Sequence, residues 1–141
     1  MFTDTHANTL GWLLDKQLGT LDGVRCAVLI SADGLLHSRT SSITQEQGER
    51  HAAITSSLRG AARTYSEEFD GGGVRQVLLE MHEYVCLITQ AGENMLLLVQ
   101  TTGPDADIAT IAHQMGELAG SVGAQMAVEA RNTGPEAQAA G

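Results

Sequence analysis

A chain of 141 residues, 43% of them hydrophobic and 18% charged, is the size of one globular domain with a single core. Its formal net charge of −9 would repel phosphate backbones and anionic lipid headgroups, which excludes nucleic acid and bare membrane as expected partners. The N-terminal stretch lacks the basic start and apolar core of a secretory signal, and no run reaches a membrane-spanning length. We therefore expect a cytoplasmic protein with no direct membrane insertion.

The first half of the chain predicts a helix and a β-hairpin. Leucines at helical spacing, followed by a glycine stop, predict a helix over residues 8–18. An apolar run predicts a strand over 24–31, and the pair Asp33-Gly34 turns the chain into a returning strand over 35–40. The first strand is apolar on both faces, as in a strand covered on both sides. One of these faces is expected to carry Val24, Cys26, Val28 and Ile30.

Both cysteines of the chain lie inside apolar runs. Cys26 and Cys86 are therefore expected to pack as small core residues, since an unpaired cysteine in such a run usually does so. This use of cysteine is typical of a reducing compartment.

A long helix is predicted over residues 44–68, with Thr44 or Ser42 as its N-cap. Apolar side chains recur along it every three or four residues, and we expect this stripe to face the domain's own sheet. The stripe comprises Ile54, Leu58, Ala61, Ala62, Tyr65 and Phe69.

Three further strands and a last helix follow. Apolar runs over 74–82, 84–90 and 95–102, separated by short turns, predict an antiparallel meander. Pro104 and a candidate N-cap at Asp105 open the last helix, whose apolar stripe is continuous.

The order of elements predicts an α+β fold, α-β-β-α-β-β-β-α, in which one five-stranded antiparallel sheet carries helices on both faces, as in profilin-like and longin-like domains. Residues 1–7 are expected to be a flexible N-terminus and 8–130 to form the domain. Residues 131–141 lack an apolar period and predict a disordered C-terminal tail.

A search for chemistry finds no catalytic residue, cofactor site or metal site. Residues 71–73 are three glycines without the lysine or the following helix of a phosphate loop, and the five histidines have no metal-ligand spacing. Glu80 and Glu83 flank a predicted turn, where carboxylates are usually solvated, and no serine has a nucleophile setting.

The long middle helix is more informative. Opposite the apolar stripe it carries the small residues Ala52, Ser56 and Gly60. Such a seam allows another helix to approach closely, and Gly60 in mid-helix favours a packing reason. The flanking charged residues that could frame the seam are Glu49, Arg59, Arg63 and Glu67. An ordinary solvated surface with helix-forming alanines is the alternative.

Three stretches in their order and spacing resemble a roadblock-family domain, the dynein light-chain-type module. They are "LLDKQLGTLDGVRCAVLISADGLLHS", "AAITSSLRGAA" and "VRQVLLEMHEYVCLITQAGENMLLLVQTTGPDADIATIAHQM", and the resemblance spans about residues 8–128. The chain is also similar to actinobacterial members encoded beside a sensor histidine kinase-like protein and a Ras-like GTPase.

The resemblance implies a non-catalytic homodimeric regulator or scaffold that binds a small Ras-like GTPase and modulates its nucleotide cycle or localisation. Roadblock domains pair through the middle helix and the third strand. The interface implied here comprises Glu49, Ala52, Ser56, Arg59, Gly60, Arg63, Val74, Gln76 and Leu78. A sensor histidine kinase-like protein is a further implied partner. A small-ligand sensor domain of PAS or GAF type and a small hydrolase stay open as alternatives.

Overall fold

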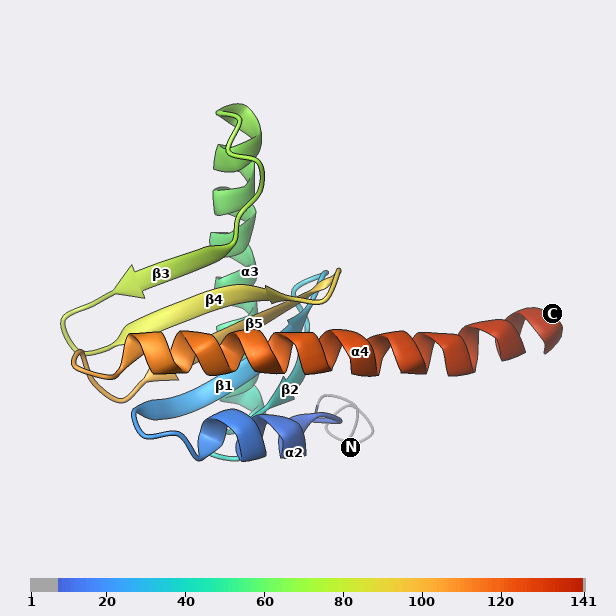
Figure 1. Cartoon of the computed structure of the whole chain (residues 1–141), viewed down its shortest axis with the longest axis horizontal. Helices are drawn as coiled ribbons and strands as arrows, with labels where there is room; N and C mark the ends of the chain where they lie inside the picture. Colours follow the sequence, from blue (N-terminus) through green and yellow to red (C-terminus); the bar gives the residue numbers. More distant parts are fainter. Residues whose placement is uncertain (1–7, 141) are drawn as a thin grey trace.

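The computed structural model describes residues 8–140, with side chains as far as residue 128. Its strands are β1 (Val24–Ser31), β2 (Leu36–Arg39), β3 (Gln76–Glu80), β4 (Val85–Ala91) and β5 (Met95–Thr101). Its helices are α2 (Gly11–Leu14), which continues as a π-helical turn over Asp15–Gly19, α3 (Gln45–Glu68) and α4 (Ile108–Ala140). All strands form one antiparallel sheet in the order β2-β1-β5-β4-β3 (Figure 1). The predicted fold class and the β3-β4-β5 meander are confirmed.

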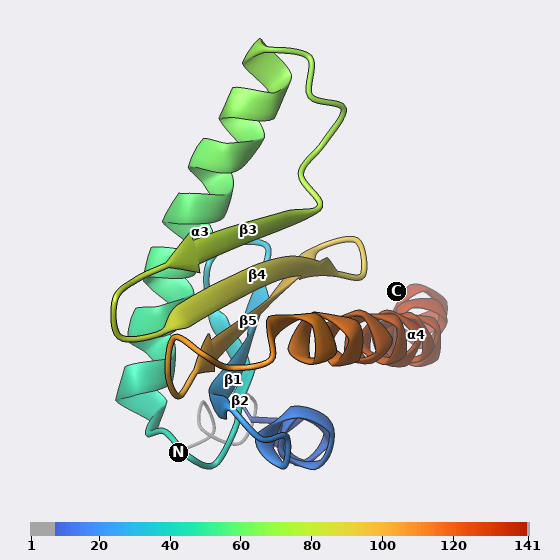
Figure 2. The same cartoon turned by 60° about the vertical axis from the view of Figure 1, so that its left-hand side comes forward.

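The sheet separates two apolar clusters. Helix α3 crosses one face, while α2 and α4 cover the other (Figure 2). The cluster beneath α2 and α4 includes Leu14, Leu18, Leu29, Leu87, Leu97, Ile111, Met115 and Leu118. The cluster beneath α3 includes Cys26, Val28, Ile30, Ala52, Cys86, Ile88 and Leu98. Because β1, β4 and β5 contribute side chains to both clusters, they form the middle layer of the molecule.

Two tight turns rely on glycine. Gly34 has φ of +83° in the β1–β2 turn, and its N–H donates to the carbonyl of Ser31 at 3.0 Å, which confirms the predicted hairpin. Gly92, with φ of +74°, lies in the β4–β5 turn. A Cβ built on Gly92 would lie 3.4 Å from the Cα of Gly123, so α4 passes close to this turn.

The face assignment of β1 needs one correction. The register against β5 shifts between Val24 and Cys26, because Arg25 is an extra residue at that point. Val24 consequently packs with Ala27 and Leu29 in the cluster beneath α2 and α4, and not with Cys26. Side chains of a regular strand alternate between the two faces of the sheet, and the prediction assumed this alternation from Val24 onward. The bulge at Arg25 interrupts it.

Both cysteines are buried and unpaired, as predicted for core residues. Cys26 and Cys86 lie opposite Gln100 on its two sides, so strand β5 separates them. Two strand spacings amount to about 10 Å, beyond the reach of a disulfide. Burial raises the pKa of Cys26 to about 11 and also raises the pKa of Cys86, so both thiols remain protonated.

The ends of the helices differ from expectation in several places. The first helix is split into α2 and the π-helical turn, and residues 1–7, expected to be flexible, lie outside the described residues. Thr44 is the N-cap of α3: its hydroxyl accepts from the N–H of Gln47, whose side chain accepts from the N–H of Thr44.

The last helix starts later and extends further than predicted. Asp107, and not Asp105, caps its start, since its carboxylate accepts from the N–H of Thr110 at 3.2 Å. The backbone stays helical to Ala140, where a disordered tail was expected from residue 131. The domain boundaries themselves stay predictions.

Candidate functional site

Helix α3 is rotated relative to the prediction. Its buried residues are Gly48, Ala52, Thr55 and Ser66. Ala52 is 1% exposed beneath the helix, while Ile54, Tyr65 and Phe69 of the predicted core stripe are 63%, 69% and 66% exposed. The expectation that this stripe faces the sheet is therefore wrong for these three side chains, although Leu58 of the same stripe packs against the cluster beneath α3.

The rotation has a steric cause. Large side chains of β1, β4 and β5 already fill this face of the sheet, so α3 approaches it through small residues. A Cβ built on Gly48 would lie 2.9 Å from Cδ2 of Leu36 and 3.2 Å from Cδ of Arg39. The small residues thus serve packing inside the chain, and the large apolar ones are left outside.

The predicted interface residues divide into three groups. Ala52 belongs to the core and is not available to a partner. Ser56, Arg59, Gly60 and Arg63 line a hollow on one flank of α3, while Glu49 is exposed nearer its start. Val74 precedes β3, and Gln76 and Leu78 lie on that strand. A Cβ at Gly60 would meet no atom within 4 Å, so no neighbour in the described chain requires glycine there.

The other flank of α3 is apolar and open to solvent. Ile54, Tyr65 and Phe69, here named the apolar flank, lie along it, and the rings of Tyr65 and Phe69 are 5.0 Å apart. Leu58 is half-buried on the same side and packs against the cluster beneath α3. Exposed large apolar side chains in a row are typical of an interaction surface. The sequence contained this stripe, but its helical period is the same whether it meets a core or a partner.

The end of α3 projects past the sheet. The turns near its C-terminus extend beyond β3, the last strand on that side, so they cover no strand of residues 8–140 (Figures 1 and 2). The loop that returns to β3 is held to the helix by Ser66, whose hydroxyl accepts from the N–H of Gly73 at 2.9 Å. We call these projecting last turns of α3, which end at Glu68, the overhang.

Strand β3 is an edge strand. It pairs with β4 from Gln76 to Glu80, and no strand of residues 8–140 lies on its other side. Leu78 is 51% exposed, while Val77 and Leu79 are half-buried on the α3 side of the sheet. An edge with free backbone groups and an exposed leucine is suited to pairing with another strand. This edge position leaves β3 open to the strand pairing that the roadblock resemblance implies.

The described residues offer little for catalysis. No three His, Cys, Asp or Glu side chains among them come together as metal ligands. The Nε2 atom of His51 lies 3.9 Å from Sγ of Cys26. Burial, and secondarily the charge of Arg25, lower the pKa of His51, whereas burial raises the pKa of the thiol. Both shifts favour the neutral forms of the imidazole and the thiol, so this pair is not arranged to produce a thiolate nucleophile. No helix in the part of the chain that the structure describes is both long and apolar enough to cross a membrane.

Comparison with known proteins identifies the family. Residues 10–101 match the model of the Roadblock/LC7 domain, which is more than half of the chain. The chain belongs to the Roadblock/LC7 family. The resemblance inferred from the three sequence stretches is thereby confirmed. No curated protein matches the chain.

Solved structures extend the comparison. A Roadblock/LC7 domain from Streptomyces avermitilis is 31% identical, with a TM-score of 0.78, and the match covers 83% of this chain and 97% of that one. MglB from Myxococcus xanthus is 13% identical, with a TM-score of 0.72 and coverage of 88% and 90%. Profilin IA from Acanthamoeba castellanii is 16% identical, with a TM-score of 0.52 and coverage of 82% and 98%. The last two share the fold of this Roadblock/LC7 domain.

Proposed function

We propose that this Roadblock/LC7 protein is a non-catalytic homodimeric regulator or scaffold that binds a small Ras-like GTPase and modulates its nucleotide cycle or localisation. The observation that carries the proposal is the combination of an open β3 edge, the overhang of α3 and the apolar flank. Together they form a surface suited to protein contacts. The GTPase follows from the family, whose bacterial members occur beside small GTPases, and a sensor histidine kinase-like protein is a further proposed partner.

A second copy of the chain fits this surface. If β3 pairs with β3 of the partner, the two sheets join into one and the open edge is removed. The overhang of each protomer then packs on strands of the partner's sheet. The two α3 helices run side by side, so their apolar flanks can contact each other.

The proposed interface differs in part from the one implied by the sequence. Val74, Gln76 and Leu78 belong to it because they lie at or near the edge strand. Ile54, Tyr65 and Phe69 replace Ala52, which packs inside the chain. The residues around Arg59 lie on the flank opposite the apolar one, and they remain accessible in such a dimer.

The dimer is tested by charge at the apolar flank. Tyr65→Glu places two carboxylates in the contact between the helices, and we expect it to turn a dimer into a folded monomer in light scattering at micromolar concentration. Ala53→Glu, at an exposed position away from this flank, is the matched control and should stay dimeric. A monomeric wild type, or a Tyr65→Glu variant that stays dimeric, contradicts the arrangement.

GTPase binding is tested with purified proteins. A purified small Ras-like GTPase is loaded with GDP or with a GTP analogue, and its association with the Roadblock/LC7 protein is followed by interferometry. We expect binding that differs between the two nucleotide states, with no GTP hydrolysis by the Roadblock/LC7 protein alone. Absence of binding in both states contradicts the proposal. A small molecule that copurifies with the protein would instead favour the sensor-domain alternative.

A further inference from the structure

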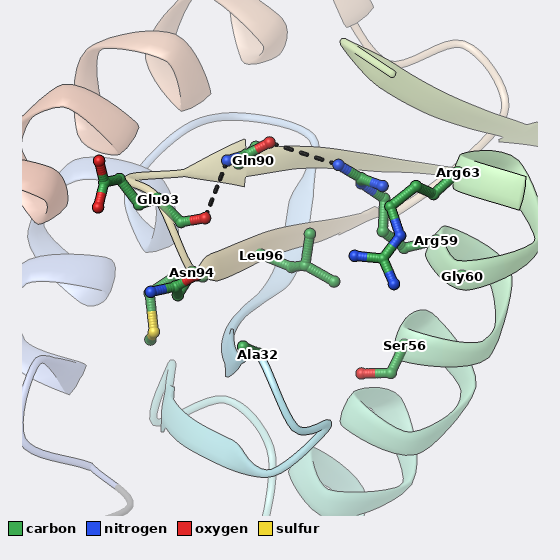
Figure 3. A pocket seen from close by; sticks show the side chains of 10 residues that line it. Ala32, Ser56, Arg59, Gly60, Arg63, Gln90, Glu93, Asn94 and Leu96 are labelled. Atoms are coloured by element: carbon green, nitrogen blue, oxygen red, sulfur yellow. Dashed lines mark hydrogen bonds between the residues drawn. The ribbon is translucent and has the colours of Figure 1, made fainter. Parts of the chain in front are cut away.

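A hollow lies on the flank of α3 opposite the apolar one, between the helix and the β4–β5 turn. Its volume is about 320 Å³. Arg59 and Arg63 border it on the helix, while Ala32 and Leu96 line it from β1's end and β5 (Figure 3). A second depression adjoins it, shares both arginines and adds Arg75. Hence three of the eight basic residues in a chain of net charge −9 gather here.

The two helical arginines are not neutralised. Within the described part of the chain, neither Arg59 nor Arg63 forms an ion pair, whereas Arg50 pairs with Glu46 at 3.2 Å. Arg59 donates to Oε1 of Gln90 at 3.3 Å, which turns its guanidinium toward the β4–β5 hairpin. In Figure 3 the carboxylate of Glu93 points away from both guanidinium groups.

A hydroxyl in the same hollow also lacks a partner. Oγ of Ser56 is buried and forms no hydrogen bond, although buried polar groups normally do. Ser56 projects from α3 into the hollow, one turn before Gly60 and the arginines (Figure 3). Beside this hydroxyl lie two guanidinium groups without a carboxylate partner, one of them bound only to the amide of Gln90, and their remaining N–H groups can donate to a ligand.

We infer that this hollow is a docking site for an acidic segment of a partner protein, in which a carboxylate side chain stands beside an aliphatic one. Arginine guanidinium groups bind carboxylates through paired hydrogen bonds, and Ala32 and Leu96 offer an apolar surface for the aliphatic neighbour. The carboxylates of Glu67, Asp70 and Glu93 also lie along the rim, so the carboxylate of the ligand must sit between the two arginines of α3. The hollow is separate from the apolar flank of the proposed dimer, because it lies on the other flank of α3; the adjoining depression, in contrast, is bordered by Val74 of the dimer edge.

The test uses an end-blocked hexapeptide, Ala-Leu-Glu-Glu-Leu-Ala, and its counterpart with both glutamates replaced by glutamine. Binding is followed by NMR on the side-chain Nε–Hε signals of the arginines in the full chain. We expect the acidic peptide to shift Arg59 and Arg63 in a saturable way, and to leave Arg50 unchanged. The glutamine peptide should bind about tenfold more weakly or not at all, since each lost charge-assisted hydrogen bond is costly.

Variants separate the site from general charge effects. Arg59→Gln with Arg63→Gln should weaken the acidic peptide about tenfold or more, while Arg50→Gln should not. Thermal unfolding of the double variant checks that it folds, and Arg59→Lys with Arg63→Lys should restore part of the binding. The Tyr65→Glu monomer should bind the peptide as the wild type does, so loss of the dimer and loss of this site are distinguished.

Three results would overturn the inference. One is the absence of any saturable shift at Arg59 and Arg63. Another is an equal shift at Arg50, which would indicate unspecific screening by a charged peptide. The third is inorganic phosphate or pyrophosphate binding more tightly than the acidic peptide, which would make the hollow a phosphate site.

Discussion

The imidazole of His51 lies where α3 covers β1, in contact range of the buried Cys26 thiol. Burial, and next the positive charge of Arg25, lower its pKa in the folded chain. An unfolded chain has neither effect, and its histidine titrates near pH 6.5. The unfolded state therefore binds a proton at this residue more readily than the folded state does, and acid favours unfolding here.

We expect the free energy of unfolding to fall as the pH drops below about 6.5, and to keep falling until His51 protonates in the folded state as well. His51→Gln should reduce this dependence, and Ala53→Gln, at an exposed position of the same helix, should leave it as in the wild type. Urea midpoints measured across this range give the comparison. An unchanged pH dependence in His51→Gln would remove His51 as its source.

Helix α3 contains two glycines in contrasting settings. Gly48 lies where the helix approaches Leu36 and Arg39, whereas the surroundings of Gly60 are open. Replacing an interior helical glycine by alanine gains about 0.5–1 kcal/mol when the added methyl meets nothing.

Gly60→Ala should therefore raise the free energy of unfolding by about 0.5–1 kcal/mol. Gly48→Ala should gain less, or lose stability, since Leu36 and Arg39 must move to admit the methyl group. Chemical denaturation of the two variants under one buffer measures the difference. A larger gain at Gly48 than at Gly60 would contradict the close approach of α3 to β2.

The same helix marks the limit of what the sequence could predict. Its N-cap, its length and all five strands follow from local signals: capping residues, Asp33-Gly34, and apolar runs between turns. The side to which its apolar stripe points does not follow from these local signals. Ile54, Tyr65 and Phe69 repeat as core residues would, and only the crowding of the sheet beneath α3 decides that Ala52 faces inward. The arginine hollow likewise depends on the end of β4, where Gln90 lies 31 residues further along the chain and meets Arg59.

At the scale of the whole molecule, two clusters share one sheet. Leu118 is fully buried between α4 and the sheet, whereas Ile88 lies beneath α3 on the opposite face. Since β1, β4 and β5 supply both clusters, neither face can lose its packing alone. We expect one cooperative unfolding transition.

Leu118→Ala should lower the free energy of unfolding by about 2–5 kcal/mol through the cavity that it leaves. Fluorescence of Trp12 on α2 and circular dichroism of the whole chain should still give coincident transitions, both shifted. A variant in which fluorescence changes well before circular dichroism would show that the two faces unfold separately.

The sheet order also governs the sequence of folding events. Strands β1 and β2, and the β3-β4-β5 meander, are joined by short turns, so each group can form from neighbouring residues. Pairing of β1 with β5 joins Ser31 to Met95 and must close the loop that contains α3. This closure carries the largest chain-entropy cost among the strand pairings, so we expect it to limit the folding rate. During synthesis, β1 consequently waits without its main partner until β5 has left the ribosome, with α3 already complete above it.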